Sequence, residues 1–445
     1  MSSIINAGVD GIILTASSTA ALNIQAGGTN AIQISTGAAT TITNATITTL
    51  TTSNPLVFPA GSASAPAVTT TGDTNTGIYF PAADQVAVTT GGTVAAGFNS
   101  NGLFFRNRII NGDMRIDQRN AGAAVTANDA FPVDRFKLAQ NTDGACSVQQ
   151  DTSVPAGFVN SLKYTTTTAD GTLTTTQNTS IAQNIEGTNI ADLAWGTANA
   201  RTVTLSFWVR SSLTGTFGGA ISNSAINRSY PFSYAISVAD TWEYKTITIP
   251  GDTTGTWLTT TGIGMRVIFG LGVGPDRSGT AGAWAASTVF APTGAVSVIG
   301  TLSATWYVTG VQLETGSVAT PFERRPYGTE LMLCQRYCYS VKDDGDGNSV
   351  FGTGMAFGNT NAGAAIQFPV TMRATPSTLT TTGTFNAWSS TGAALAVTAT
   401  SLNVVSNPNI GWIGITVGGG GLVAGNATAL YAASTTAQLT FSAEL

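Results

Sequence analysis

The chain has 445 residues, of which 42% are hydrophobic and 9% charged, with a formal net charge of −5. This hydrophobic content suffices for packed cores and excludes a disordered chain, while the weak negative charge excludes a nucleic-acid-binding protein. No stretch approaches the roughly 18 consecutive apolar residues of a membrane helix, so we expect no membrane insertion.

The uncharged surface must consist largely of Thr, Ser, Asn and Gly, and the sequence contains 51 glycines. Thr favours strands, and clusters of Gly, Asn and Ser favour the turns between them, so we predict an all-β fold. Three cysteines, Cys146, Cys334 and Cys338, are too few for a disulfide framework. We therefore expect synthesis in a reducing cytoplasm.

Residues 1–72 carry a repeat that predicts a β stalk. Ile12, Leu22, Ile32 and Ile42 follow one another at intervals of ten residues. The two apolar residues of each unit supply roughly 3–6 kcal/mol, whereas ordering the unit costs on the order of 10 kcal/mol. We therefore expect the stalk to assemble with other copies of itself. A floppy Thr/Ser/Gly linker is the alternative.

Residues 73–106 alternate short strand-like runs with turn residues and predict a β-meander collar. Residues 107–326 contain longer strands and six tryptophans, which favour one large jelly-roll β-sandwich. In "RTVTLSFWVR", period two divides the strand into an apolar face of Val203, Leu205, Phe207 and Val209 and a polar face of Thr202, Thr204, Ser206, Trp208 and Arg210.

Residues 327–445 are predicted to form a smaller C-terminal β-sandwich with one short helix at its start. The helix is "GTELMLCQRYC", with Thr329 as N-cap and Leu331, Cys334 and Cys338 on one face. Six strand-like runs follow it. The two cysteines are interpreted as small packing residues, because a zinc site would need more ligands than the chain supplies here.

Several classes of chemistry can be excluded or weakened. The chain has no histidine, which excludes Ser-His-Asp and Cys-His catalysis and histidine metal sites. "KDDGDGNS" places Asp344, Asp346 and Asn348 at the spacing that opens a calcium loop. However, Ser349 stands where such a loop needs Gly, so an acidic turn is the preferred interpretation and these three remain a weak metal candidate. We predict no cofactor.

Glycoside cleavage would need two carboxylates about 5–10 Å apart. The pairs closest in sequence are Asp240 with Glu243 and Asp129 with Asp134. Both pairs lie beside strand starts, where solvated turn charges are common. We therefore predict that the protein is not an enzyme.

The polar face around Trp208 and Arg210 is the candidate binding site. An exposed indole stacks on a sugar ring, and neighbouring polar groups bind the sugar hydroxyls. Trp306 and Gln312, on a later strand, are predicted to extend this carbohydrate-contact surface. The alternative is that another strand, loop or protomer covers this face and leaves Trp208 in the core.

Charge gathers in "GVQLETGSVATPFERRPYGTELMLCQRYC", residues 310–338. Without a histidine or a suitably placed second acid, this cluster has no reaction to perform. We predict that it fixes the angle between domains, or between protomers, through ion pairs among Glu323, Arg324, Arg325 and Glu330.

Several stretches resemble bacteriophage tail fibre proteins. Residues 64–93 are similar to fibre shaft segments, whereas "NRIINGDMRIDQRNAG" (107–122), "SFWVRSS" (206–212) and the 310–338 stretch resemble a jelly-roll body domain found in fibres of tailed phages, including cyanophages. The body block is also similar to carbohydrate-binding modules. Such modules often hold a structural calcium ion, so the resemblance implies that one can be present here, but it assigns no ligands in this chain.

The resemblance implies a homotrimeric virion appendage, made in the host bacterial cytoplasm. Its N-terminus would attach to other tail or baseplate proteins, and its distal domains would contact a host surface glycan or protein during adsorption. The alternative is a purely structural head fibre, collar or baseplate protein. A polysaccharide-degrading spike is disfavoured, because the long β-helix that carries the catalytic carboxylates of such spikes is not evident in this sequence.

Overall fold

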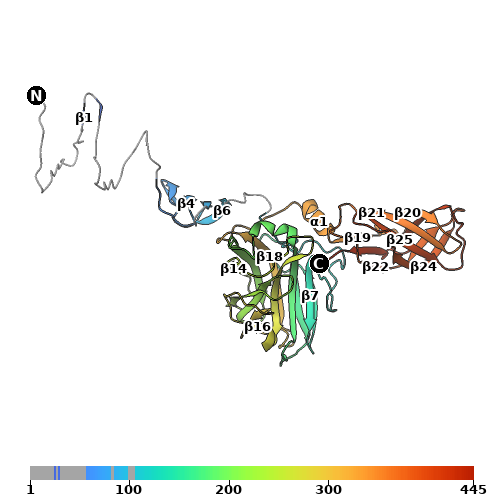
Figure 1. Ribbon diagram of the computed structural model, residues 1–445, viewed down its shortest axis with the longest axis horizontal. Coiled ribbons are helices and arrows are strands. Elements are labelled where there is room, and N and C mark those ends of the chain that lie inside the picture. The colour runs from blue at the N-terminus through green and yellow to red at the C-terminus, as the bar shows by residue number, and fades with distance from the viewer. Residues whose placement is uncertain (1–24, 27–28, 31–56, 82–84, 99–105) are drawn as a thin grey trace, which may run out of the picture. The chain divides into compact units, whose positions relative to one another are not determined.

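The computed structural model describes residues 25–26, 29–30, 57–81, 85–98 and 106–445 (Figure 1). The chain divides into two units, residues 1–57 and 58–445. In the first unit, β1 (Gln25–Ala26) and β2 (Thr29–Asn30) pair antiparallel. The other residues of the predicted stalk up to residue 56 lie outside the described residues.

The second unit begins with a four-stranded antiparallel sheet in the order β3-β4-β5-β6. Gly91 and Gly92, with φ of 57° and 77°, make the two-residue turn between β5 and β6, where both positions need a positive φ. The sheet begins before residue 73, the predicted start of the collar. Its strands are β3 (Val68–Thr70), β4 (Asp73–Tyr79), β5 (Val86–Thr90) and β6 (Thr93–Phe98).

Residues 106–326, here called the body, form two five-stranded antiparallel sheets. The first sheet has the order β13-β12-β15-β10-β7 and the second β14-β11-β18-β9-β8. The chain crosses repeatedly between the two sheets and stays within one sheet only at the neighbouring pairs β8-β9 and β12-β13, which confirms the predicted jelly-roll sandwich. The strands are β7 (Phe136–Asn141), β8 (Ala145–Asp151), β9 (Ser161–Thr168), β10 (Asn178–Glu186), β11 (Val203–Ser211), β12 (Gly215–Ser222), β13 (Ser229–Ile236), β14 (Glu243–Ile249), β15 (Ile263–Val273) and β18 (Thr305–Thr315).

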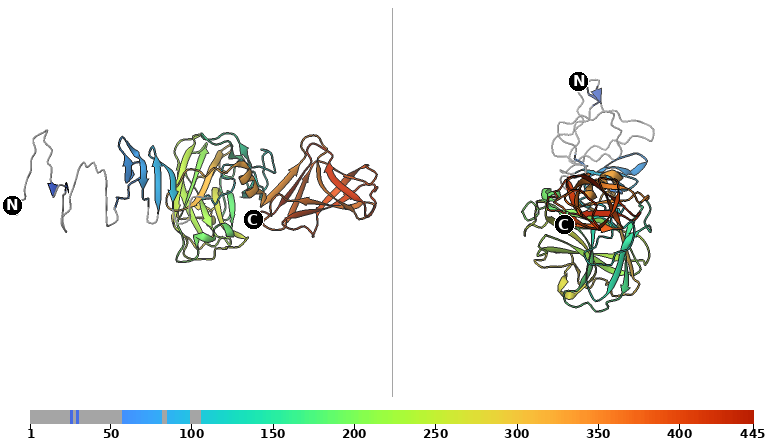
Figure 2. Two further views of the ribbon diagram at one scale, coloured as in Figure 1. Left: turned by 90° about the horizontal axis from the view of Figure 1, so that it is seen from above. Right: turned by 90° about the vertical axis from the view of Figure 1, so that its right-hand side faces the viewer.

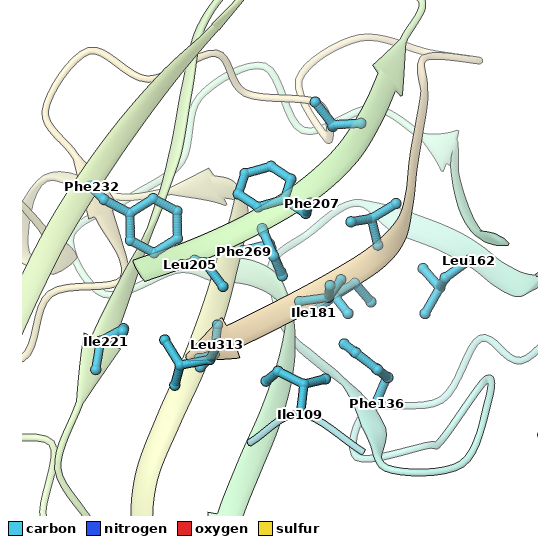
Figure 3. Packing of buried hydrophobic residues seen from close by; sticks show 14 of the residues in the cluster. Ile109, Phe136, Leu162, Ile181, Leu205, Phe207, Ile221, Phe232, Phe269 and Leu313 are labelled. Carbon is cyan, nitrogen blue, oxygen red and sulfur yellow. The ribbon is translucent and has the colours of Figure 1, made fainter. Parts of the chain in front are cut away.

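The body core lies between the two sheets, and the alternation of β11 builds part of it. Val203, Leu205, Phe207 and Val209 are all buried there, as predicted. Figure 3 shows Phe207 beside Phe269 of the opposite sheet, and their ring centroids are 5.1 Å apart in an edge-on contact. Short elements complete the body: η1 (Gly187–Asn189), η2 (Ala191–Leu193), η3 (Pro275–Arg277) and the parallel pair β16 (Ser278–Gly279) and β17 (Ala291–Pro292).

The predicted helix is α1 (Tyr327–Gln335), at the start of the C-terminal domain, residues 327–445. Its N-cap is Pro326 rather than Thr329, which lies inside the first turn. The chain leaves the helix at Arg336, so Cys338 belongs to a strand and the predicted helical face is wrong at that residue. Cys334 packs with Ile110, Ile116 and Tyr337 in a small cluster.

The remaining strands form a closed six-stranded barrel and a three-stranded sheet (Figure 2). The all-β prediction is confirmed, but here the strands close on themselves: β26 pairs with both β20 and β23, which removes the free edges of an open sheet. The barrel strands are β20 (Val350–Ala356), β21 (Asn361–Gln367), β25 (Ile410–Val417), β24 (Ala394–Leu402), β23 (Phe385–Trp388) and β26 (Ala427–Ala432). The sheet strands are β19 (Cys338–Lys342), β27 (Gln438–Ser442) and β22 (Thr378–Thr382).

No helix within the described residues is long and apolar enough to cross a lipid bilayer.

Candidate functional site

The outer face of the second sheet carries a group of aromatic side chains, here called the outer aromatic face: Trp208, Trp242, Tyr244 and Tyr307. Trp208 is half-buried, and its ring centroid lies 5.4 Å from that of Tyr244, with the rings tilted by 46°. Tyr244 is 43% exposed. The structure therefore leaves an accessible aromatic ring beside Trp208, from a residue that the sequence analysis did not select.

Arg210 lies next along the same face and is held by three neighbours. Its guanidinium carbon is 5.0 Å from the ring centroid of Tyr307. One guanidinium nitrogen donates to the Ser153 hydroxyl (2.7 Å), and another is 3.1 Å from an Asp240 carboxylate oxygen. Arg210 is thus held in one place at the edge of the outer aromatic face, where its charge is partly balanced by Asp240.

The predictions for Trp306 and Gln312 as carbohydrate contacts are wrong. Trp306 is fully buried, and its indole N–H donates to the Tyr234 hydroxyl (3.2 Å). The reason is a β-bulge at Gly310, whose φ of 62° lets β18 place an extra residue opposite β11. The bulge reverses the alternation, so Trp306 faces the core although Gln312 faces outward.

Gln312 is buried on the outer side by the chain that follows its own strand. Its side-chain amide donates to a Glu314 carboxylate oxygen (2.8 Å) and to the Thr320 carbonyl (3.1 Å). Its amide oxygen accepts from the Glu323 backbone N–H (2.8 Å). Gln312 therefore fixes residues 314–323 of the charged stretch and offers no surface to a ligand.

The charged stretch surrounds one buried guanidinium, that of Arg325, which is 7% exposed. It lies 3.1 Å from a Glu323 carboxylate oxygen and 3.3 Å from one of Glu330 on α1. It also donates to the backbone carbonyls of Asn107 and Ile109 in the first segment of the body. Burial raises the pKa of Glu330, and the Arg325 charge opposes that rise.

Arg324 does not take part as predicted. Its guanidinium lies over the rings of Phe158 (4.7 Å) and Phe322 (5.8 Å) instead of beside Glu323 or Glu330. Two successive arginines on an extended segment point to opposite sides. Because Arg325 points inward, Arg324 is directed to the surface of the body.

A second set of polar contacts joins the body to the C-terminal domain, and the sequence analysis did not find it. Glu186, at the end of β10, is 0% exposed and accepts two bonds from the Arg336 guanidinium (2.9 and 2.7 Å) and one from the Tyr337 hydroxyl (2.7 Å). Near the C-terminus, Glu444 pairs with Arg119 (3.0 Å) and with Arg135. Arg325 with its partners Glu323 and Glu330 is here called the Arg325 cluster. This cluster and the contacts of Glu186 and Glu444 are together called the joint.

The joint also contains a buried carboxyl with the opposite pKa behaviour to Glu186. Burial raises the pKa of Asp134 to about 6, although Arg119 at 3.2 Å opposes the rise. Burial also acts to raise the pKa of Glu186, but the hydrogen bonds from Arg336 and Tyr337 outweigh it and hold that pKa below its usual value. Asp134 therefore adds stability at acid pH that is lost as the pH rises through about 6. Glu186 adds stability at neutral pH that is lost as the pH falls through its lowered folded-state pKa.

Glu186→Gln is expected to lower the free energy of unfolding at pH 7 by about 2 kcal/mol, because charged hydrogen bonds become neutral while one acceptor remains. The folded-state pKa of Glu186 lies below its usual value of 4.5. The difference between wild type and variant should therefore shrink as the pH falls below about 4.5. Urea unfolding from pH 3 to pH 7 measures it, and a difference independent of pH would contradict the assignment.

The acidic turn behaves as a turn closed by its own backbone. Carboxylate oxygens of Asp343, Asp344 and Asp346 lie within 4.8 Å of one another. The backbone N–H of Asn348, the third residue of the metal candidate, donates to an Asp346 carboxylate oxygen (2.7 Å). Desolvation acts to raise the pKa of Asp343, but hydrogen bonds from the backbone N–H groups of Gly347, Ser349 and Gly345 outweigh it and lower that pKa to about 2. Asp344 and Asp346 of the weak metal candidate therefore lie together with Asp343, in a loop whose backbone N–H groups bind the Asp343 and Asp346 carboxylates.

The acids considered for glycoside cleavage each have a basic partner. These ion pairs are Asp240 with Arg210, Glu243 with Lys245, Asp129 with Lys137, and Asp134 with Arg119.

No protein-family model and no curated protein matches this chain. Among solved structures, the enzymatically active domain of tailspike protein 4 from bacteriophage CBA120 is similar at 12% identity, over 47% of this chain and 22% of that chain, with a TM-score of 0.26. The chain thus spans about a fifth of that solved chain.

Two carbohydrate-binding modules are also similar. TmCBM61, solved with beta-1,4-galactotriose, is 8% identical over 47% of this chain and 99% of its own, with a TM-score of 0.25. A family 11 module of a cellulosomal cellulase from Clostridium thermocellum is 13% identical over 44% of this chain and 97% of its own, with a TM-score of 0.22. At these values the likenesses carry no argument about this chain.

Proposed function

We propose that this protein is a non-enzymatic, homotrimeric fibre of a tailed phage that binds a glycan on the host cell surface during adsorption. The observation that carries the proposal is the outer aromatic face, where Tyr244 is accessible beside the half-buried Trp208. The resemblance of residues 107–122, 206–212 and 310–338 to the body domain of tail fibres supports the same conclusion. The N-terminal repeat, which the sequence predicts to need other copies of itself to fold, supports the trimer.

The chemistry of the outer aromatic face suits a sugar chain. The apolar side of a sugar ring stacks on an aromatic ring, and its hydroxyls bind nearby polar groups. Tyr244 provides the ring, and Thr246 and Thr248 are exposed two and four residues further along β14 on the same face. One such site binds weakly, and three copies on one fibre would raise the overall avidity.

Tyr244→Ala is expected to weaken binding of the full-length protein to host cells by about tenfold per site, which corresponds to about 1.4 kcal/mol. Trp388→Ala is the matched control, because Trp388 is 44% exposed but lies on the barrel. Flow cytometry with labelled protein measures both. Loss in the Trp388 variant with none in the Tyr244 variant would place the contact on the barrel and overturn the proposed site.

The second candidate is a structural virion component without a receptor. It is favoured by the way Arg210 is already occupied by Ser153, Asp240 and Tyr307. This alternative predicts no saturable binding to host cells by the wild-type protein. Titrating labelled wild-type protein onto host cells in the flow-cytometry experiment therefore separates the two functions.

A further inference from the structure

A groove of about 420 Å³ opens between the body and the three-stranded sheet of the C-terminal domain. One side is formed by the body segment that includes Arg119, Asn120 and Phe131. The floor is one face of β22 and β27, and we call the whole feature the joint groove. Its floor residues are Thr378, Thr380, Thr382, Gln438, Thr440 and Ser442.

The register of the two strands explains why the floor is polar. Thr378 pairs with Ser442, Thr380 with Thr440 and Thr382 with Gln438, which places two rows of three polar side chains on one face. The residues between them have the opposite orientation, and Leu439 and Phe441 are fully buried in the core of the domain. The floor is therefore an ordered array of hydroxyl and amide groups on a rigid support.

Part of this array is not used within the protein. Thr440 shares a hydrogen bond with the Ser340 hydroxyl (2.9 Å), and Gln438 donates to the Gln118 carbonyl (2.9 Å). Across residues 57–81, 85–98 and 106–445, the exposed hydroxyls of Thr378 and Thr380 have no protein hydrogen-bond partner. Each can donate one bond and accept two.

The charges at the groove are balanced. Arg119 is paired with Asp134 (3.2 Å) and Glu444 (3.0 Å), and its guanidinium lies 4.6 Å from the ring centroid of the half-buried Phe131. Asp129 at the rim pairs with Lys137 (2.6 Å). A phosphate or a polyacid would find no uncompensated positive charge here. A neutral ligand with many hydroxyls would find hydroxyl partners on the floor and an aromatic ring at the wall.

We infer that the joint groove is a second carbohydrate-binding site, which takes a short, neutral glycan segment. Its volume lies in the range of small-molecule sites, roughly 300–1,000 Å³. The inference rests on the proposed function for the class of ligand, but it uses different residues from the outer aromatic face. Because the side of the groove belongs to the body and its floor to the C-terminal domain, the joint must be intact for the groove to keep its shape.

The test uses the full-length protein and a panel of neutral trisaccharides, including maltotriose, cellotriose and beta-1,4-galactotriose, observed by saturation-transfer NMR. Thr380→Val removes one floor hydroxyl and keeps the shape and strand preference of the residue. Thr381→Val is the matched control, since Thr381 is exposed on the same strand but does not line the groove. Both threonine variants are made in the Tyr244→Ala protein, so that the outer aromatic face does not contribute to trisaccharide binding.

We expect the Tyr244→Ala protein to retain trisaccharide binding, Thr380→Val to weaken that binding about fivefold, as loss of about one hydrogen bond implies, and Thr381→Val to leave it unchanged. The double variant Thr378→Val with Thr380→Val should weaken it further. Absence of trisaccharide binding, or equal binding by the Thr380 and Thr381 variants, would overturn the groove assignment.

The proposed function is judged separately, by the binding of the wild-type protein to host cells. If the double variant keeps trisaccharide binding but loses its trimeric mass in light scattering, the groove is an interface between copies and the inference is wrong.

Discussion

Arg325→Ala is expected to lower the free energy of unfolding by about 3–5 kcal/mol, the cost of removing one partner from a buried ion pair. The substitution would leave the buried carboxylate of Glu330 without its counter-charge and two body carbonyls, those of Asn107 and Ile109, without their donor. The pKa of Glu330, already raised by burial, should rise further and make the loss depend on pH.

Arg324→Ala is the matched control for this experiment, because the neighbouring arginine is exposed and stacks on surface rings. Its cost should stay below about 1 kcal/mol. Differential scanning calorimetry of the full-length protein measures both variants, and limited proteolysis shows whether the body and the C-terminal domain separate. Equal effects of the two substitutions would show that the Arg325 cluster does not fasten the joint.

Trp306→Ala is expected to lower the free energy of unfolding of the body by about 3–5 kcal/mol, as for other large-to-alanine substitutions in cores. Trp306 is fully buried against Phe269, with ring centroids 5.5 Å apart, and it donates a hydrogen bond to Tyr234. Alanine would leave a cavity between the sheets and an unpaired buried hydroxyl.

The contrast with Tyr244→Ala makes the Trp306 experiment informative. Tyr244 is partly exposed, so its removal should cost about 1 kcal/mol or less. Urea titration with tryptophan fluorescence measures both variants. If Trp306→Ala were as stable as the wild type and bound host cells poorly, Trp306 would be a ligand contact after all, and the core assignment would be wrong.

Local patterns in the sequence predicted local structure well. The alternation of "RTVTLSFWVR" identified the buried face of β11, because period two is a property of the strand itself. The same reasoning failed on β18, where the bulge at Gly310 reverses the alternation. A lone glycine in a strand can signal a bulge, but in a chain with 51 glycines this signal is weak.

Contacts between distant segments were not predictable from one sequence. Arg325 and Glu330 lie in one charged stretch and could be proposed as partners. Glu186 and Arg336 are 150 positions apart, and nothing local marks Glu186 as different from other strand-end acids. The joint groove could not be predicted for the same reason, since the threonines of β22 are visible in the sequence but their pairing with β27 is not.

The central claim, that the fibre binds a host glycan, is tested most directly by titrating the purified full-length protein onto host cells before and after periodate treatment, which cleaves sugar rings at vicinal hydroxyls. The proposal predicts saturable binding to untreated cells that is lost after periodate and is unaffected by treating the cells with protease. Binding that survives periodate but disappears after protease, or no saturable binding at all, would contradict it.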